Sequence, residues 1–130
     1  MAIEKTSVVV ISGTLERLQM AAMVASVAAV SGHEVTVFLS MNALPLFVRG
    51  TAVRAPAEGE MGVLMQSKQV PEFKMLFEQA VELGEARILP CSMAMDVMGV
   101  ERDQLEGYLG EATGLTKFLA DVQGSQVWTF

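Results

Sequence analysis

The sequence predicts a three-layer α/β/α sandwich around a mainly parallel sheet of about five strands. Residues 7–11 and 34–39 are short, β-branched and apolar, which is typical of strands that are buried on both faces. A helix of roughly sixteen residues separates them and ends at Gly32. Because strand–helix–strand units of this kind are nearly always right-handed and parallel, we expect helices to cover both faces of the sheet.

The rest of the chain continues the alternation of strands and helices. Residues 86–89 form a short apolar run that we interpret as a buried strand. The helix before this strand carries Phe73, Leu76 and Phe77 at helical spacing, and we expect it to end at Gly84. The other expected elements are short helices at 43–48, 93–98 and 101–105, a helix at 113–122 and a last strand at 125–130.

Length, charge and cysteine content narrow the class of protein. The 130 residues are expected to form one domain, 1–130, and the net charge of −6 argues against a nucleic-acid surface. A single cysteine cannot form an internal disulfide, so we expect a cytoplasmic protein, with no signal peptide or membrane span. The apolar fraction of 52% and the nearly featureless Ala/Met helix over 19–30 predict a homo-oligomer.

Cys91 is the residue at which the sequence predicts chemistry. It follows the strand at 86–89, which Pro90 ends because proline has no N–H to donate, and it precedes the helix at 93–98. Open α/β sheets bind ligands at the carboxyl ends of their strands, and the N–H groups of a helix start favour a negatively charged sulfur. The same sheet edge is expected to gather Ser12, Gly13, Thr14, Asn42 and Ser92.

Residues 49–69 interrupt the pattern of strands and helices. Glycine, proline and charged residues are scattered through this stretch without a clear periodicity. A stretch of this length in a small domain is typical of a lid, a binding loop or a disordered insert. Because it follows the short helix that leaves the second strand, we expect it to be mobile and to lie over the Cys91 edge of the sheet.

The nine residues that begin at Cys91 read Cys-Ser-Met-Ala-Met-Asp-Val-Met-Gly. This run resembles the Cys-x-Met-x-Met-Asp-x-Met-Gly motif in one branch of the DsrE/DsrF-like family, and the likeness extends to residues 12–15 and 110–114. The resemblance implies a three-layer α/β fold, sulfur transfer and a homo-oligomer that is a trimer or a multiple of one. It also implies that Cys91 carries a persulfide that passes to or from a TusA-type carrier or a rhodanese.

The other motif residues are expected to support the cysteine. Met93, Met95 and Met98 are expected to wall the site with apolar side chains, whereas a Cu(I) site would need several soft ligands that converge. Asp96 is expected to orient the motif helix or to cap a nearby N–H. Residues 12–14 lack the full Gly-x-Gly-x-x-Gly pattern, so we predict no nucleotide, and the prediction includes neither a cofactor nor a metal.

Three classes of function remain open at this point. The first is a sulfur carrier or sulfurtransferase that uses Cys91. The second is a thiol redox protein, peroxiredoxin-like or a sensor, although the chain has no second cysteine to resolve the oxidised one. The third is a non-catalytic oligomeric binding module with an inert buried thiol. His33, the one histidine, precedes the strand at 34–39 and is expected at the opposite edge, so we predict no Cys–His nucleophile pair.

Overall fold

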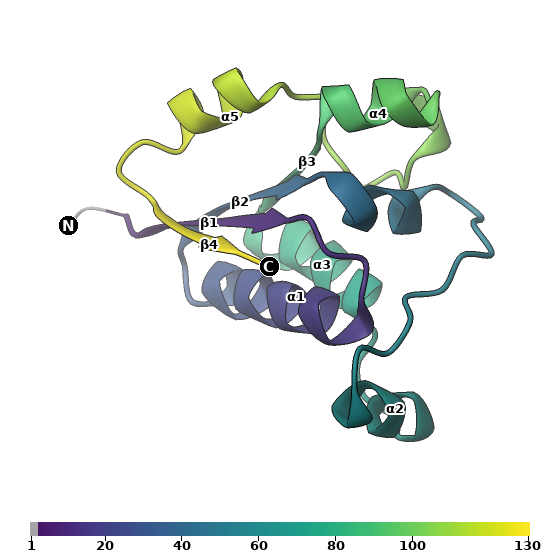
Figure 1. Cartoon of the computed structure of the whole chain (residues 1–130). Helices are drawn as coiled ribbons and strands as arrows, with labels where there is room; N and C mark the ends of the chain where they lie inside the picture. The colour runs from purple at the N-terminus through teal and green to yellow at the C-terminus, as the bar shows by residue number, and fades with distance from the viewer. Residues whose placement is uncertain (1–2) are drawn as a thin grey trace.

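The sheet of the computed structural model, which describes residues 3–130, has four strands and lies between two layers of helices (Figure 1). All neighbouring strands are parallel, and their order across the sheet is β3-β2-β1-β4. This arrangement confirms the predicted three-layer α/β/α sandwich. The strands are β1 (Lys5–Val10), β2 (Glu34–Leu39), β3 (Arg87–Pro90) and β4 (Gln126–Thr129).

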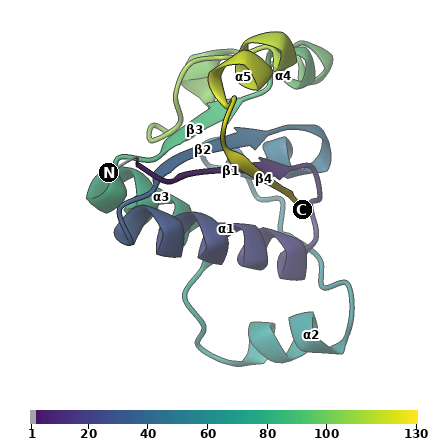
Figure 2. The same ribbon diagram turned by 90° about the vertical axis from the view of Figure 1, so that its left-hand side faces the viewer.

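Helices cover both faces of the sheet. Figure 2 shows α1 (Leu15–Val30) and α3 (Phe73–Gly84) on one face, and α4 (Ser92–Met98) and α5 (Leu115–Asp121) on the other. Two short 3-10 helices, η1 (Met41–Phe47) and η2 (Arg102–Gln104), follow β2 and α4. No helix within residues 3–130 is long and apolar enough to cross a membrane.

The core fills the space between the sheet and each layer of helices. Phe38 of β2 stacks on Phe118 of α5 with ring centroids 4.8 Å apart. On the other face Phe47 meets Phe77 of α3 edge to face at 5.7 Å. The first pair packs α5 on the sheet, and the second packs α3 on η1, the helix that follows β2.

The sheet has one strand fewer than the predicted number of about five. Residues 110–113 run beside β3, where the Gly110 N–H donates to the Ile88 carbonyl at 2.7 Å and the Thr113 N–H donates to the Pro90 carbonyl at 2.9 Å. This segment and β3 form a single parallel β-bridge, between Cys91 and Thr113. Pro90 has no N–H to return a bond on this side, so the contact does not extend into a fifth strand.

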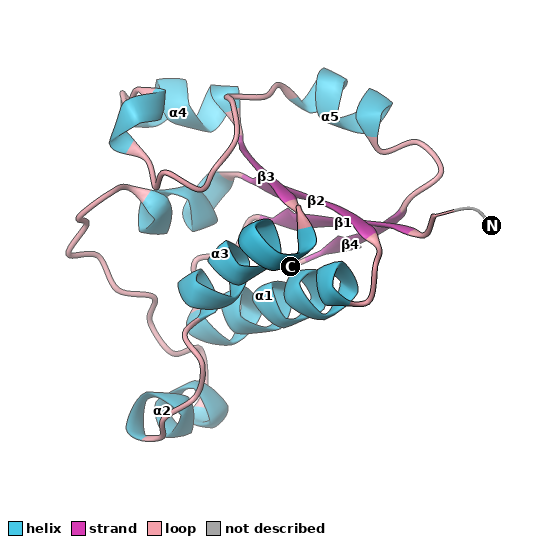
Figure 3. Cartoon of the chain, turned by 180° about the vertical axis from the view of Figure 1, so that it is seen from behind, coloured by secondary structure: helices cyan, strands magenta, loops and turns pink. Residues whose placement is uncertain are grey.

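Residues 49–69 contain a helix that the sequence did not indicate, α2 (Glu60–Ser67). Figure 3 shows α2 projecting from the α1 side of the molecule, away from α4. The Glu16 carboxylate holds the start of α2 there, because it accepts hydrogen bonds from the N–H groups of Glu58 and Gly59, both at 2.7 Å, and of Gly62 at 3.1 Å. Residues 49–69 do reach the carboxyl edge near β1, where the Leu15 N–H donates to the Pro56 carbonyl at 2.9 Å and the Thr14 hydroxyl to Glu58 at 3.2 Å, but the expectation that they cover Cys91 itself is wrong.

Helices α1 and α3 approach closely at Gly84. A Cβ atom on Gly84 would lie 2.4 Å from the Cβ atom of Ala29, which is far inside van der Waals contact. Helix α3 ends at Gly84, as predicted, and Glu85 rather than a glycine takes the left-handed conformation that closes it, with φ of 56°. This glycine is needed for helix packing rather than for a turn.

Candidate functional site

Cys91 lies where β3 meets α4, and its backbone is hydrogen-bonded to β2 and to α4. Its N–H donates to the Leu39 carbonyl of β2 at 2.8 Å, and its carbonyl accepts from the Met95 N–H at 3.0 Å. The Cys91 side chain is 5% exposed and forms part of the hydrophobic core. Gly99 closes α4 in the left-handed conformation, with φ of 70°, which glycine adopts without strain. The thiol is therefore held in a fixed and sheltered position.

Thr113 is a neighbour of Cys91 that sequence reasoning did not single out. The Thr113 carbonyl accepts from the Ser92 N–H at 3.0 Å, and the Thr113 hydroxyl donates to the Glu111 carbonyl at 2.9 Å. Thr113 is buried, and it pairs with Cys91 on the side opposite β2. The family resemblance of residues 110–114 was a signal that this segment matters. Its position beside residues 90–92 is a tertiary contact that no local pattern encodes.

The turns after β1 and β2 meet at the carboxyl edge of the sheet, which also carries Cys91 (Figure 1). The Asn42 N–H donates to the Ile11 carbonyl at 3.1 Å, and a Cβ atom on Gly13 would lie 2.6 Å from the Asn42 carbonyl oxygen. The Ser12 and Thr14 hydroxyls are 3.0 Å apart and hydrogen-bonded. Thr14 occupies the N-cap position of α1 without a side-chain capping bond, because its hydroxyl bonds to side chains instead.

Met41, the first residue of η1, has a strained backbone. Its φ is 49°, in the left-handed region that side chains other than glycine rarely adopt, and its side chain is exposed. Backbone strain of this kind occurs most often at functional sites. Nothing in the local sequence indicated the strain, which arises where the chain turns from β2 into η1.

The three methionines of the motif and Asp96 differ in burial. Met95, one helical turn after Cys91, is buried, Met98 is half-buried, and Met93 is exposed. Asp96 is exposed too, and within residues 3–130 its carboxylate accepts no hydrogen bond, so the expected cap on a nearby N–H is not formed. The apolar wall near the sulfur therefore rests on Met95 more than on Met93.

His33, the one histidine, is not placed to act as an acid or base for the Cys91 thiol. The Nδ1 atom of His33 and the hydroxyl of Thr6 share a hydrogen bond of 2.8 Å. This bond lies at the amino ends of β1 and β2. Cys91 follows the carboxyl end of β3, so the two side chains lie at opposite edges of the parallel sheet. Within residues 3–130, no three His, Cys, Asp or Glu side chains cluster closely enough to hold a metal ion.

A cavity of about 380 Å³ lies beside β3, but Cys91 does not line it. Its walls include Leu89, Gly110 and Thr113, together with Lys117 and Asp121 of α5. Thr113 thus stands next to Cys91 and also borders this cavity.

Residues 51–130 match the model of the DsrE/DsrF/DrsH-like family. The chain belongs to this family. The matched part includes β3, the whole motif from Cys91 to Gly99 and the segment with Thr113, so the resemblance drawn from the motif is confirmed. Among curated proteins, none matches the chain in sequence.

Two solved structures share the fold of this DsrE/DsrF/DrsH-like protein. The YchN protein of E. coli superimposes with a TM-score of 0.63 at 17% identity, covering 97% of this chain and 99% of YchN. The MTH1491 protein of Methanobacterium thermoautotrophicum, described as a protein of unknown function, gives a TM-score of 0.65 at 11% identity, covering 98% of this chain and 99% of its own. The fold is therefore shared over the full length at low sequence identity.

Proposed function

We propose that this DsrE/DsrF/DrsH-like protein is a sulfur carrier or sulfurtransferase that holds sulfane sulfur as a persulfide on Cys91. The observation that carries the proposal is the position of the single cysteine, at the junction of β3 and α4 within the matched family motif. Free thiolates at such junctions are nucleophilic, and persulfide exchange requires a nucleophilic sulfur.

The chemistry consists of two thiolate attacks. In the first, the Cys91 thiolate attacks the outer sulfur of a donor persulfide, R–S–SH; the S–S bond of the donor breaks, Cys91–S–SH forms and R–S⁻ leaves. In the second, the thiolate of an acceptor attacks the outer sulfur of Cys91–S–SH, and the Cys91 thiolate leaves. Neither step needs an oxidant, a reductant or a histidine base.

Burial of the sulfur supports a carrier role. A persulfide is easily oxidised or hydrolysed in water, and the Cys91 side chain is 5% exposed within an apolar core that includes Met95. The same burial restricts the partners, because a bulky reagent cannot reach the sulfur. A partner has to present a terminal sulfur on a narrow projection, and a TusA-type carrier or a rhodanese is the proposed donor or acceptor.

Intact-mass spectrometry after exposure to polysulfide or to a loaded rhodanese tests the proposal. The wild-type protein should gain the mass of one or more sulfur atoms, and a reductant should remove that mass. Cys91→Ser should gain nothing. The double variant Cys91→Ser/Ser92→Cys moves the thiol by one residue to a more exposed position; we expect it to load but to lose the added sulfur faster.

Failure of Cys91 to gain sulfur from either donor would contradict the proposal, provided that iodoacetamide labels the same thiol in the folded protein. A Cys91 that instead forms a stable sulfenic acid with peroxide would favour a redox sensor. Labelling only after unfolding, with no sulfur gained before it, would favour an inert buried thiol and a binding module.

A further inference from the structure

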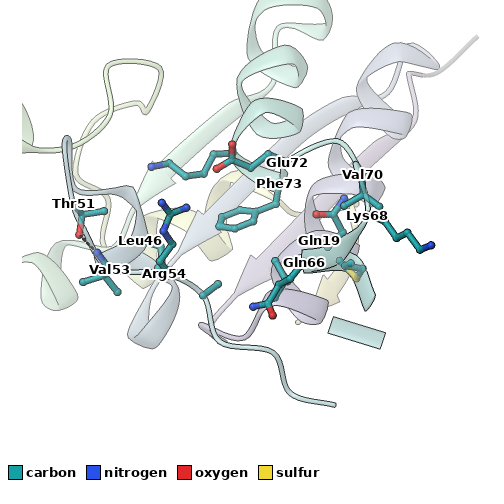
Figure 4. Close-up of a pocket in the computed structure, with 14 residues that line it drawn as sticks. Gln19, Leu46, Thr51, Val53, Arg54, Gln66, Lys68, Val70, Glu72 and Phe73 are labelled. Carbon is teal, nitrogen blue, oxygen red and sulfur yellow. Dashed lines mark hydrogen bonds between the residues drawn. The ribbon is translucent and has the colours of Figure 1, made fainter. Parts of the chain in front are cut away.

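A second cavity, which Cys91 does not line, has three of its lining side chains positively charged although the protein is acidic. This cavity, of about 530 Å³, is bounded by η1, the start of α3 and the two ends of the 49–69 segment. Figure 4 shows Thr51, Val53 and Arg54 on one side and Val70, Lys68 and Gln19 on the other. Its volume is within the range of small-molecule sites.

We propose that this cavity binds a small organic anion, a carboxylate or sulfonate that also has an apolar body and an N–H or O–H group. Three features of the cavity specify these three parts of the ligand: a cationic side chain without an ion-pair partner, a hydrogen-bond acceptor without a donor, and apolar walls. The proposal does not depend on the sulfur chemistry of Cys91.

The cationic feature is Arg54. The whole chain has nine Lys and Arg residues at a net charge of −6, yet three of the nine line this cavity with one carboxylate, Glu72. Lys74 is paired with Glu106 at 3.5 Å, and Lys68 points outward at the rim (Figure 4). Within residues 3–130 no carboxylate pairs with Arg54, so its planar guanidinium is free to bind an anionic group.

The acceptor is the side-chain carbonyl of Gln19. Gln19 is 8% exposed, and its amide nitrogen donates to the Pro71 carbonyl at 2.8 Å, which fixes the orientation of the amide group. Gln19 lines the cavity, and its Oε1 has no hydrogen-bond donor among residues 3–130. A carbonyl oxygen without a donor in a residue that lines the cavity favours a ligand that donates a hydrogen bond.

The apolar walls come from three elements. Leu15 of α1, Leu46 of η1 and Phe73 of α3 all line the cavity, and Leu46 and Phe73 are themselves buried. A purely inorganic anion would leave these surfaces in contact with water, whereas a ligand with an aliphatic or aromatic body covers them. Residues 49–69, which we expected to cover Cys91, instead supply two sides of this cavity.

Two fluorescent dyes with the same rings separate charge from apolar contact. Anilinonaphthalene sulfonate has a sulfonate, an N–H and two aromatic parts, and N-phenylnaphthylamine has the same rings and N–H without the sulfonate. We expect both to bind the wild-type protein. Arg54→Gln should weaken binding of the sulfonate about tenfold, the usual cost of losing a hydrogen bond to a charged group, and should leave the neutral dye within about twofold.

Three control variants complete the experiment. Lys5→Gln makes the same change in net charge on the exposed start of β1 and should leave binding of both dyes unchanged. Ala55→Phe should fill the cavity and abolish binding of both dyes, with folding checked by circular dichroism. Cys91→Ser should bind both as the wild type does.

Two results would overturn the proposal. One is an equal loss of sulfonate binding in Arg54→Gln and Lys5→Gln. That result would show that the net charge of the protein, and not Arg54 itself, determines sulfonate binding. The other is unchanged dye binding in folded Ala55→Phe, which would place the dye on an exposed apolar surface instead of in the cavity.

Discussion

Single residues at the carboxyl edge of the sheet are packed without spare room, and Gly13 is the clearest case. A Cβ atom there would lie 2.6 Å from the backbone oxygen of Asn42, which cannot move without disturbing the turn after β2. We expect Gly13→Ala to lower the free energy of unfolding by about 1–3 kcal/mol, the usual cost of overpacking. Urea unfolding measures this change.

Gly114→Ala is the matched control for Gly13→Ala. A Cβ atom on Gly114 would meet only the Ser92 hydroxyl, at 3.7 Å, an ordinary contact. Its unfolding midpoint should stay close to that of the wild type. Equal stability of the two variants would show that the turns after β1 and β2 are not held as tightly as the geometry indicates.

The residues of the site differ in how far the sequence could predict them. Pro90 and Gly99 mark the end of a strand and of a helix through backbone chemistry, so the place of Cys91 between β3 and α4 could be found locally. Thr113 could not, because it reaches Cys91 across more than twenty residues of chain through backbone bonds alone. The strain at Met41 depends equally on tertiary packing.

At the scale of elements, α2 depends on one carboxylate. Glu16 accepts three N–H groups at the start of α2, and Arg17 adds an exposed ion pair to Glu58 at 3.0 Å. We expect Glu16→Gln to loosen α2, so that trypsin cleaves at Lys68 faster than in the wild type. Glu60→Gln removes another carboxylate from the first turn of α2 and should not change the rate.

The three hydrogen bonds between the Glu16 carboxylate and the start of α2, called here the Glu16 clasp, should respond to pH. The pKa of Glu16 lies below its ordinary value, first because of the Glu58 N–H. Burial has the second-largest effect and raises the pKa, and the N–H groups of Glu16 itself, Gly59 and Gly62 lower it further. A lowered pKa in the folded state means that the clasp is complete at neutral pH and is lost as the pH falls through that lowered value.

Nuclear magnetic resonance follows this titration through the amide signals of Gly59 and Gly62. Both should shift together, with a midpoint below that of an ordinary glutamate. A midpoint at or above the ordinary value, or signals that titrate separately, would contradict the clasp.

The clasp also explains why α2 was not predicted. Its eight residues have no strong amphipathic pattern, and three apolar side chains, Met61, Val63 and Leu64, are exposed. What fixes the helix is a side chain more than forty residues earlier in the chain. By contrast, α1 and α3 are long enough to be predicted from periodicity or composition, and only their ends required the structure.

At the scale of the whole molecule, the outer face of α1 is apolar although one chain does not cover it. Helix α1 buries mainly small side chains, and it leaves four apolar residues exposed at spacings of three and four: Met20, Met23, Val27 and Val30. Val27 and Val30 are 65% and 71% exposed. This stripe favours contact with a second copy of the chain.

We therefore predict a homo-oligomer that sediments well above the 14.0 kDa of one chain, and the family resemblance implies that it is a trimer or a multiple of one. Val27→Glu should shift the sedimentation toward the monomer, because it places a charge in the stripe. Val97→Glu introduces the same change on α4, at a residue that is 79% exposed, and should leave the assembly intact. A wild-type protein that is monomeric at micromolar concentration would contradict the prediction.

The overall architecture was the most predictable level of the structure. Continuous apolar strands joined by helical crossovers leave few topologies, and the parallel sheet with helices on both faces follows from them. The exact number of strands was not predictable, because Pro90 prevents a fifth strand from forming beside β3. The path of residues 49–69 was not predictable either, since Glu16 determines it through long-range bonds.

Discharge of sulfur from the loaded protein tests the central claim most directly. The protein is loaded with polysulfide, freed of the donor and mixed with a TusA-type carrier that has one reactive thiol, and the intact masses of both proteins are recorded over time. We predict that the Cys91 protein loses one sulfur atom as the carrier gains one. A persulfide that stays on Cys91 in the presence of the carrier thiol, or a carrier that gains sulfur equally from Cys91→Ser, would contradict the claim.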